Sequence, residues 1–266
     1  MSLKYLQFEI MDKVGVLYFN SPPANGLNLE LVNELTTIVN SLKADVGGTR
    51  SLIITSKIEN IFIAGADIKM IMKHMDGPNL VTDMIRFNSS LQQVINEIEC
   101  LPFPVIAAIN GHAMGGGLEL ALACDFRFMS KGKARIGLPE INLGLLPGAG
   151  GTQRISRLIG KSRAKDLIFN SKLFNAEDAL ASGLVDQIYD PESLMGKSLE
   201  YANKLKGRPG ISISVVKACI DKGIEVSLKE GLAIEMAGLE RLLNTNDAKE
   251  GVTAFLEKRK PFFQSK

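Results

Sequence analysis

The sequence predicts an α/β fold of layered strands and helices, followed by an all-helical C-terminal part. Short β-branched segments alternate with longer segments whose apolar residues recur at helical spacing, as in layered α/β proteins. This strand signal fades after Ile188, whereas helical spacing continues to about Lys258. The 266 residues, 45% hydrophobic and 23% charged, suffice for a large buried core and exclude a disordered or fibrous chain.

The N-terminal half contains the predicted alternation of strands and helices. We expect a hairpin of strands at 5–10 and 13–20 around a turn at Asp12. A helix then begins after Asn28, a capping residue type, and stops at Gly47-Gly48. The elements expected next are strand 51–55, helix 80–99, strand 105–110, a glycine turn, helix 118–124 and strand 126–130.

The C-terminal part is predicted to be entirely helical. No Pro- or Ser-rich linker separates it from the preceding residues, so we expect a packed subdomain and not a tethered second domain. We divide the chain into a core over residues 1–195 and a helical part over residues 196–266. The expected helices are 192–206, 211–223, 228–244 and 247–258.

Charge and hydropathy exclude two classes of partner. Thirty-one Lys and Arg against 29 Asp and Glu give a net charge of +2, too small for the positive field on which nucleic-acid binding usually depends. Apolar stretches such as 105–109 are far shorter than the ~18 residues of a membrane span, and no signal-peptide core begins the chain. We therefore predict no nucleic-acid partner, no membrane partner and a cytoplasmic or equivalent reducing location.

The sequence also provides little for a disulfide framework or a metal site. Cys100, Cys124 and Cys219 are far apart in apolar surroundings, which is typical of reduced thiols in a core. His74 and His112 are the only histidines. We therefore predict no metal.

Neither common nucleotide-binding motif is complete. Residues 160–162 resemble the end of a P-loop, but Ile155 occupies the position of its first glycine. Residues 148–153 end in Gln153, where a dinucleotide fingerprint needs its third glycine. We therefore expect no nucleotide cofactor.

Two turns of small residues remain as candidates for holding a negatively charged oxygen. Residues 110–119 contain three consecutive glycines at a helix start, where N–H groups point outward. Residues 62–68 form a similar turn after a strand, with Asp67 placed to cap the next helix. Side by side, the two turns would direct two N–H groups at one oxygen, an oxyanion hole. Tight packing alone is the alternative for each.

Two glutamates are candidates for acid–base chemistry. Glu119 begins an apolar helix, and Glu140 follows Pro139 in a second glycine-rich stretch. Poor solvation raises a carboxyl pKa towards the range useful for proton transfer. Simple stabilisation of the helix dipole is the alternative for Glu119. The intervening helix and strand allow both residues to reach one site.

At these residues the sequence closely resembles the enoyl-CoA hydratase/isomerase, or crotonase, superfamily. The matching segments are IAGADIK at 63–69, NGHAMGGGLELALACDFR at 110–127 and GLPEINLGLLPGAGGTQRISRLIGKSRA at 137–164. The resemblance implies a spiral of repeated ββα units as the catalytic core and C-terminal helices that form a homotrimer, commonly stacked as a dimer of trimers. It also implies an acyl-CoA thioester as the substrate, so that coenzyme A enters with the substrate and no separate cofactor is needed.

The resemblance also implies roles for individual residues. It places the oxyanion N–H groups at Ala66 and Gly116 and the catalytic acids at Glu119 and Glu140. It implies contacts with the CoA moiety, together with Ala66 and Gly116, at Ala64, Asp67, Ile68 and Lys69. Lys258 resembles a lysine that reaches CoA phosphates from the tail, although an ordinary solvated charge cluster explains it equally well.

Because both hydratase positions are glutamate, the expected reaction is reversible syn addition of water to a trans-2-enoyl-CoA, giving a 3-hydroxyacyl-CoA. We expect Glu140 to donate a proton to Cα and Glu119 to position and activate water. Residues 21–28 depart from many hydratases, which have a basic residue before a single proline, so acyl preference and some CoA contacts stay open.

Two rival functions remain. A Δ3,Δ2-enoyl-CoA isomerase of the same superfamily needs only one glutamate, so the second favours hydration. A non-catalytic scaffold or RNA-binding protein of this fold would depend on the basic residues of 131–135 and 257–260. Neither run is interleaved with aromatic residues, and solvated loops explain both.

Overall fold

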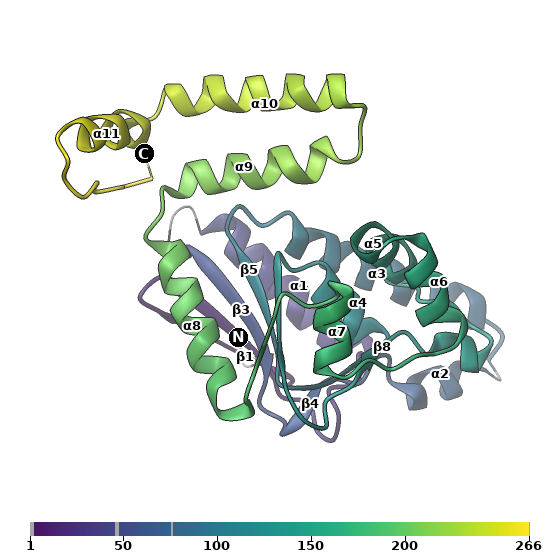
Figure 1. Cartoon of the computed structure of the whole chain (residues 1–266). Helices are drawn as coiled ribbons and strands as arrows, with labels where there is room; N and C mark the ends of the chain where they lie inside the picture. Colours follow the sequence, from purple (N-terminus) through teal and green to yellow (C-terminus); the bar gives the residue numbers. More distant parts are fainter. Residues whose placement is uncertain (1–2, 46–47, 76, 266) are drawn as a thin grey trace.

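The computed structural model describes residues 3–45, 48–75 and 77–265, which form an α/β core and a helical tail (Figure 1). The strands are β1 (Leu6–Met11), β2 (Val14–Phe19), β3 (Ser51–Ser56), β4 (Asn60–Ile63), β5 (Val105–Ile109), β6 (Gly111–Met114), β7 (Phe126–Ser130), β8 (Ile136–Gly137) and β9 (Gln187–Tyr189). The helices are α1 (Leu29–Ala44), α2 (Ile68–Met75), α3 (Leu80–Glu99), α4 (Gly116–Leu122), the 3-10 helix η1 (Glu140–Leu143), α5 (Gly151–Ile159), α6 (Lys161–Phe169), α7 (Ala176–Ser182), α8 (Pro191–Lys206), α9 (Gly210–Gly223), α10 (Leu228–Leu243) and α11 (Asn246–Leu256).

The strands form two sheets. One has the order β1-β2-β3-β5-β7-β9, and the other has the order β4-β6-β8. Three consecutive strand pairs, β3-β4, β5-β6 and β7-β8, each place their first strand in the larger sheet and their second in the smaller one before the chain turns into helices. Repeated ββα units therefore wind into a spiral, as the resemblance implies.

Both faces of the larger sheet are buried at its central strands β2, β3, β5 and β7, which explains why these strands are largely apolar. On one face α8 packs across β2, β3, β5, β7 and β9 around a cluster that includes Ile53, Phe128 and Leu194. The larger cluster, on the other face, includes residues of α1, α3 and α4. A strand covered on both sides has no polar face, and every residue of β3 is buried.

Several elements have the bounds that the sequence predicts. Helix α3 and strand β7 agree with the prediction to the residue. The side chain of Asn28 caps α1 by accepting a hydrogen bond from the Leu31 N–H at 3.0 Å. The helix ends at Ala44, and Gly47, one of the two glycines expected to stop it, lies outside the described residues.

Other elements depart from the prediction. The predicted glycine turn at 111–117 contains β6, because these residues pair with β4 and β8, which local sequence does not reveal. The short strands β8 and β9 and the helices α5 to α7 are likewise not predicted. Cys100 was expected in the core but is exposed at the end of α3, whereas Cys124 is buried and Cys219 half-buried.

The tail comprises α9, α10 and α11, which extend away from the sheets (Figure 1). Lys217 of α9 anchors the tail, because its Nζ donates to Asp125 Oδ2 of the core at 2.8 Å in a largely buried ion pair. Residue 196, the first of the predicted helical part, lies inside α8, which packs on the sheet. No helix in the described part of the chain is long and apolar enough to cross a membrane.

Candidate active site

Two tight turns lie side by side at the ends of the parallel neighbours β4 and β6. Gly65 has φ +99, and a Cβ added there would lie 3.0 Å from the carbonyl oxygen of Met114 and 3.9 Å from Gly115 Cα. Gly115 has φ +49 and ψ −122, a conformation that essentially only glycine adopts. Glycine at both positions therefore permits the close approach of the two turns.

The first turn is held by a pairing with the segment that precedes α1. The Leu27 N–H donates to the Gly65 carbonyl at 2.8 Å, and the Asp67 N–H donates to the Leu27 carbonyl at 2.9 Å. The intervening Ala66 N–H points away from this pairing, as alternate groups do along a strand. The Gly116 N–H opens α4, where no preceding turn of helix supplies an acceptor. In residues 3–45, 48–75 and 77–265, neither N–H has a hydrogen-bond acceptor.

Residues following the first turn begin α2 and form an exposed rim. Asp67 caps this helix as the sequence predicts, because its Oδ1 accepts from the Lys69 N–H at 2.9 Å. Ala66 and Asp67 are half-buried, whereas the remaining predicted CoA-contacting residues of this segment are exposed. These exposed residues are Ala64, Ile68 and Lys69.

Glu119 is buried in α4 with only 2% of its surface exposed. Its Oε1 accepts hydrogen bonds from the N–H groups of Ala149 and Gly151, both at 2.7 Å. Burial raises the pKa of Glu119, and these two N–H groups oppose that rise because they favour the charged carboxylate. Glu119 is thus a desolvated carboxylate with two fixed donors on one oxygen.

Glu140 begins η1, and its carboxyl group reaches the second turn. A Cβ added to Gly115 would lie 2.5 Å from Glu140 Oε1, so this carboxyl packs directly on the glycine. Its Oε2 is buried and has no hydrogen-bond partner among the residues that the structure describes. Burial, and then the charge of Glu119, raise the pKa of Glu140 to about 7. Both its protonated and its ionised form are therefore accessible near neutral pH.

The structure brings the four central predicted residues to one place. A Cβ on Gly116 would lie 3.9 Å from Glu119 Oε2, and the neighbouring Gly115 contacts Glu140. Both acids therefore approach the Gly115-Gly116 turn, which carries the Gly116 N–H. This arrangement can hold a polarised oxygen at the turns and move protons between two carboxyl groups. No group of three or more potential metal ligands occurs in the described ranges.

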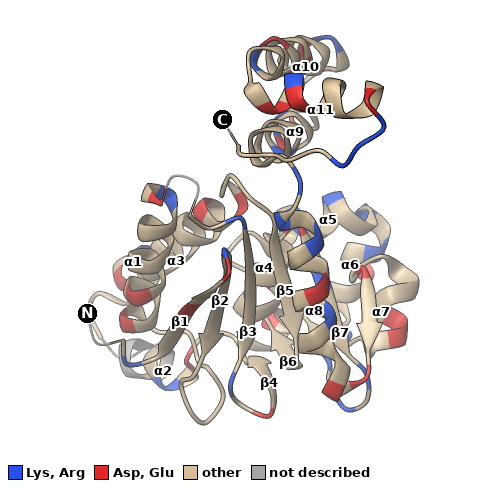
Figure 2. Cartoon of the chain, turned by 90° about the vertical axis from the view of Figure 1, so that its left-hand side faces the viewer, with Lys and Arg blue, Asp and Glu red and all other residues tan. Residues whose placement is uncertain are grey.

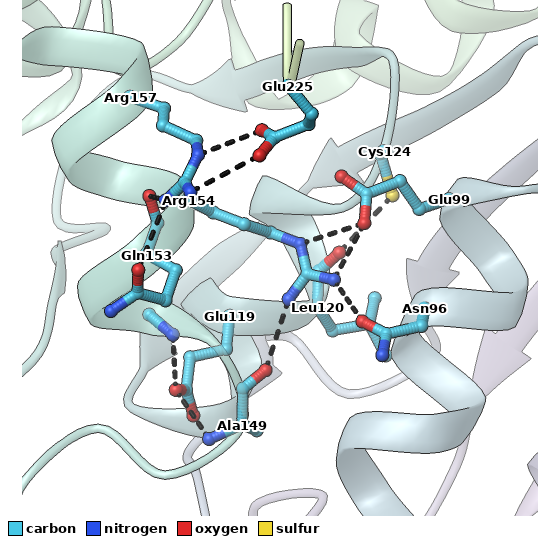
Figure 3. Close-up of polar contacts among 11 residues, drawn as sticks. Asn96, Glu99, Glu119, Leu120, Cys124, Ala149, Gln153, Arg154, Arg157 and Glu225 are labelled. Atoms are coloured by element: carbon cyan, nitrogen blue, oxygen red, sulfur yellow. Dashed lines mark hydrogen bonds and ion pairs between the residues drawn. The ribbon is translucent and has the colours of Figure 1, made fainter. Parts of the chain in front are cut away.

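Sequence reasoning missed Arg154, a residue of α5 whose side chain lies near Glu119 of α4 (Figure 3). Its Nη1 donates to the Ala149 carbonyl at 3.2 Å, and its Nη2 donates to Glu99 Oε2 at 2.7 Å. One feature of the sequence could have indicated it. Arg154 is a cation near the N-terminus of α5, where the helix dipole disfavours positive charge, and the first turn of this helix has no acidic residue.

Lys258 is the predicted site residue that the structure does not bring to this cluster. It is exposed and lies two residues beyond the end of α11, after the C-cap Glu257. That helix lies at the other end of the molecule from α2, which follows the first turn (Figure 1). Within one chain Lys258 is therefore separate from the two turns and the two glutamates.

Comparison with known proteins gives one consistent result. The family model described as enoyl-CoA hydratase/isomerase matches residues 9–266. The chain is 38% identical over 261 residues to the short-chain-enoyl-CoA hydratase of Clostridium acetobutylicum, covering 98% of this chain and 97% of the relative. It is 38% identical over 267 residues to the crotonyl-CoA hydratase of Syntrophomonas wolfei, covering 100% of both. The crystal structure of an enoyl-CoA hydratase from Bacillus anthracis is similar, with TM-score 0.92, 37% identity and coverage of 99% of this chain and 100% of that one.

Proposed function

The chain belongs to the enoyl-CoA hydratase/isomerase family and has its crotonase fold, and we propose that it catalyses reversible syn addition of water to a trans-2-enoyl-CoA. The observation that carries this proposal is the convergence of Glu119 and Glu140 at the Gly115-Gly116 turn. Two acids on one side of a bound alkene suffice to hold a water molecule and to deliver its components to adjacent carbons.

The two turns account for the electronic part of this reaction. Attack of water oxygen on Cβ of the enoyl group pushes an electron pair towards the thioester oxygen, which becomes an enolate oxygen. The N–H groups of Ala66 and Gly116 have no other acceptor in the described residues and are available to bind that oxygen. Donors fixed before the reaction stabilise the negative charge without reorganising when it develops.

The glutamates account for the two protons. Glu119 has two backbone donors that favour its ionised form, so it accepts a proton from water as the oxygen bonds to Cβ. Glu140, with its pKa raised to about 7, donates its proton to Cα as the enolate collapses. After one turnover the pair still carries one proton, now on Glu119, and exchange with solvent restores the starting state.

A direct assay with crotonyl-CoA tests the proposal. Loss of the conjugated enoyl-thioester absorbance, with formation of 3-hydroxybutyryl-CoA, is the expected result. No loss with crotonyl-CoA or with a longer trans-2-enoyl-CoA would reject hydratase activity. The assay would then turn to a 3-enoyl-CoA, because Δ3,Δ2-isomerisation needs only one glutamate to move one proton.

The pH dependence provides an independent prediction. The kcat/KM for hydration should fall as pH rises through about 7, because Glu140 loses the proton that it donates to Cα. Dehydration should show the same profile, since the reverse reaction also starts from a pair carrying one proton. Initial rates at limiting substrate in both directions measure this. A rate that stays constant across the neutral range would contradict the assignment of Glu140.

We also propose a short-chain substrate held by the exposed rim. The names of two relatives, a short-chain-enoyl-CoA hydratase and a crotonyl-CoA hydratase, support the chain length. The segment from the half-buried Ala66 to the exposed Lys69 leads from the oxyanion turn outward to solvent, which suits a thioester whose CoA extends away from the reacting carbons. A kcat/KM that increases with acyl length beyond crotonyl-CoA would contradict the short-chain proposal.

The tail supports a further proposal, that the chain assembles as a homotrimer or a dimer of trimers. Helix α10 exposes an apolar stripe at helical spacing, formed by Leu232, Met236, Leu239 and Leu243, with Leu239 48% and Leu243 71% exposed. Lys258 would need the tail of another copy beside the site to contact CoA phosphates. Sedimentation should therefore detect trimers or hexamers, and a 28.9 kDa monomer at micromolar concentration would contradict this proposal.

A scaffold or RNA-binding role has weaker support. Lys131 pairs with Asp190 at 3.2 Å, and Arg259 pairs with Glu250 at 2.7 Å, so two of the basic residues are already partly neutralised. Lys and Arg are interspersed with Asp and Glu over the core and the tail (Figure 2). RNA affinity that falls steeply with salt would favour this role.

A further inference from the structure

We propose that Arg154 is a positioning residue, which holds the Ala149–Gly151 turn so that its two N–H groups stay directed at Glu119. This inference rests on the proposed hydratase function for its kinetic consequences. Its structural part, the control of the Glu119 carboxylate by Arg154, can be measured without turnover.

The turn that holds Glu119 is shaped around the guanidinium of Arg154. Both hydrogen bonds to Glu119 Oε1 come from this one turn, so any movement of the turn affects both. Gly150 at its centre has φ +105, and a Cβ there would lie 2.1 Å from Arg154 Nη1. Glycine is therefore required both for the backbone conformation and for the space that the guanidinium occupies. Arg154 completes the contact by donating to the Ala149 carbonyl at 3.2 Å.

The other side of the guanidinium is anchored to the end of α3 (Figure 3). Nε and Nη2 of Arg154 donate to Glu99 Oε2 at 3.1 and 2.7 Å, and Nη2 also reaches Asn96 Oδ1 at 2.5 Å. The Arg154 side chain is only 13% exposed. Three elements thus meet at one planar cation: α3, the turn and α5. A lysine ammonium lacks the fork geometry needed to make these contacts together.

Arg154 also contributes its charge to the site. The charged groups that face Glu119 are Glu140 from η1 and Arg154 from α5, with Glu99 of α3 behind the guanidinium. The neighbouring strand β6 contributes His112, whose Nδ1 accepts from the Arg135 N–H at 3.2 Å. The positive charge of Arg154 favours ionised Glu119, whereas Glu140 favours its protonation. Removing Arg154 therefore weakens both the hydrogen bonds and the attraction that keep Glu119 ionised.

The same helix supplies a matched control. Arg157 lies one turn further along α5 and pairs with Glu225 of the tail at 2.9 Å (Figure 3). Its other hydrogen bonds go to Gln153, and it makes none to the Ala149–Gly151 turn. Arg157→Met removes a cation and an ion pair from α5 but leaves the support of Glu119 intact.

The experiment compares Arg154→Met, Arg154→Lys and Arg157→Met in the full-length protein. Arg154→Met should lower kcat for crotonyl-CoA by about 10- to 100-fold with little change in KM, because a displacement of about 1 Å can cost 10² in rate. The apparent pKa of the acidic limb of its pH–rate profile should rise. The reason is that Glu119 then becomes protonated more readily while Glu140 still carries its own proton. Arg154→Lys should restore part of the rate, and Arg157→Met should match the unmodified protein.

A second readout separates this inference from the function on which it rests. Infrared difference spectra report the protonated carboxyl band of Glu119, assigned by its loss in Glu119→Gln. The pH at which this band reaches half its full intensity should be higher in Arg154→Met than in the unmodified protein, whether or not the protein hydrates crotonyl-CoA. If neither the titration midpoint of the Glu119 band nor the apparent pKa of the acidic limb changed, the inference would be overturned, even if kcat fell. If Arg154→Met does not fold, Arg154→Lys must show lowered kcat, and unchanged kcat would overturn it equally.

Discussion

Glu140→Gln should lower kcat for crotonyl-CoA hydration by about 10² to 10⁴-fold, the range typical of a lost general acid or base. The amide cannot give a proton to Cα, yet it has nearly the shape of the carboxyl. Oε2 of Glu140 is buried without a hydrogen-bond partner among the described residues, so the substitution breaks no bond at that atom. Absorbance kinetics measure the effect, and circular dichroism checks the fold.

Glu119→Gln should cause a loss of the same order, because it removes the carboxylate that accepts the proton of water. The double variant should have a kcat only slightly below that of the less active single variant, since residues that act as a unit give non-additive effects. Glu177→Gln, at an exposed glutamate in the first turn of α7, is the matched control and should keep full activity. Turnover in Glu140→Gln within about threefold of the unmodified protein is well outside the expected loss and would remove Glu140 from the mechanism.

Gly115→Ala should lower kcat by about 10² to 10³-fold, comparable with the loss of one oxyanion donor. The added Cβ would lie 2.5 Å from Glu140 Oε1, so the carboxyl must move away from the reacting carbons. The backbone at φ +49 and ψ −122 also disfavours alanine, and any relaxation redirects the adjacent Gly116 N–H. One substitution thus disturbs both the acid and the oxyanion hole.

Backbone strain alone must be separated from this effect on the site. Gly183 ends α7 with φ +78, and no atom lies within 4 Å of a Cβ added there. Gly183→Ala should therefore lower stability by about 1 kcal/mol, as alanine does at positive φ, without lowering kcat. Thermal melts and kcat measured on both variants make the comparison. Equal kcat in Gly115→Ala and Gly183→Ala would contradict the proposed geometry.

The sequence predicted those elements of the fold that have a hydrophobic periodicity within their own residues. Helix α3 has apolar residues at helical spacing over 20 residues, and its bounds agree with the prediction. The four C-terminal helices, α8 to α11, agree with the predicted bounds to within two residues at each end. Strand β6 lacks such a signal, because Gly111–Met114 is extended only through its pairing with β4 and β8. Partners far along the chain are not visible in a local pattern.

The sequence indicated which residues belong to the candidate site, but not which of them contact one another. The motifs around 63–69 and 110–119 indicate the oxyanion turns, and both glutamates stand in glycine-rich, apolar segments. Only the structure places Glu140 against Gly115. Arg154 has no comparable motif, since its partners Glu99 and Ala149 lie on other segments.

The sequence by itself determined the family, the α/β core with its helical tail, and the presence of two acids beside two small-residue turns. Tertiary structure alone decided that Glu119 receives two backbone N–H groups, and that burial and the charge of Glu119 raise the pKa of Glu140 to about 7. The physical reason is that solvation and Coulomb interactions depend on distance in space. Residues that are neighbours in the folded protein can be far apart along the chain, where composition and spacing carry no record of their contact.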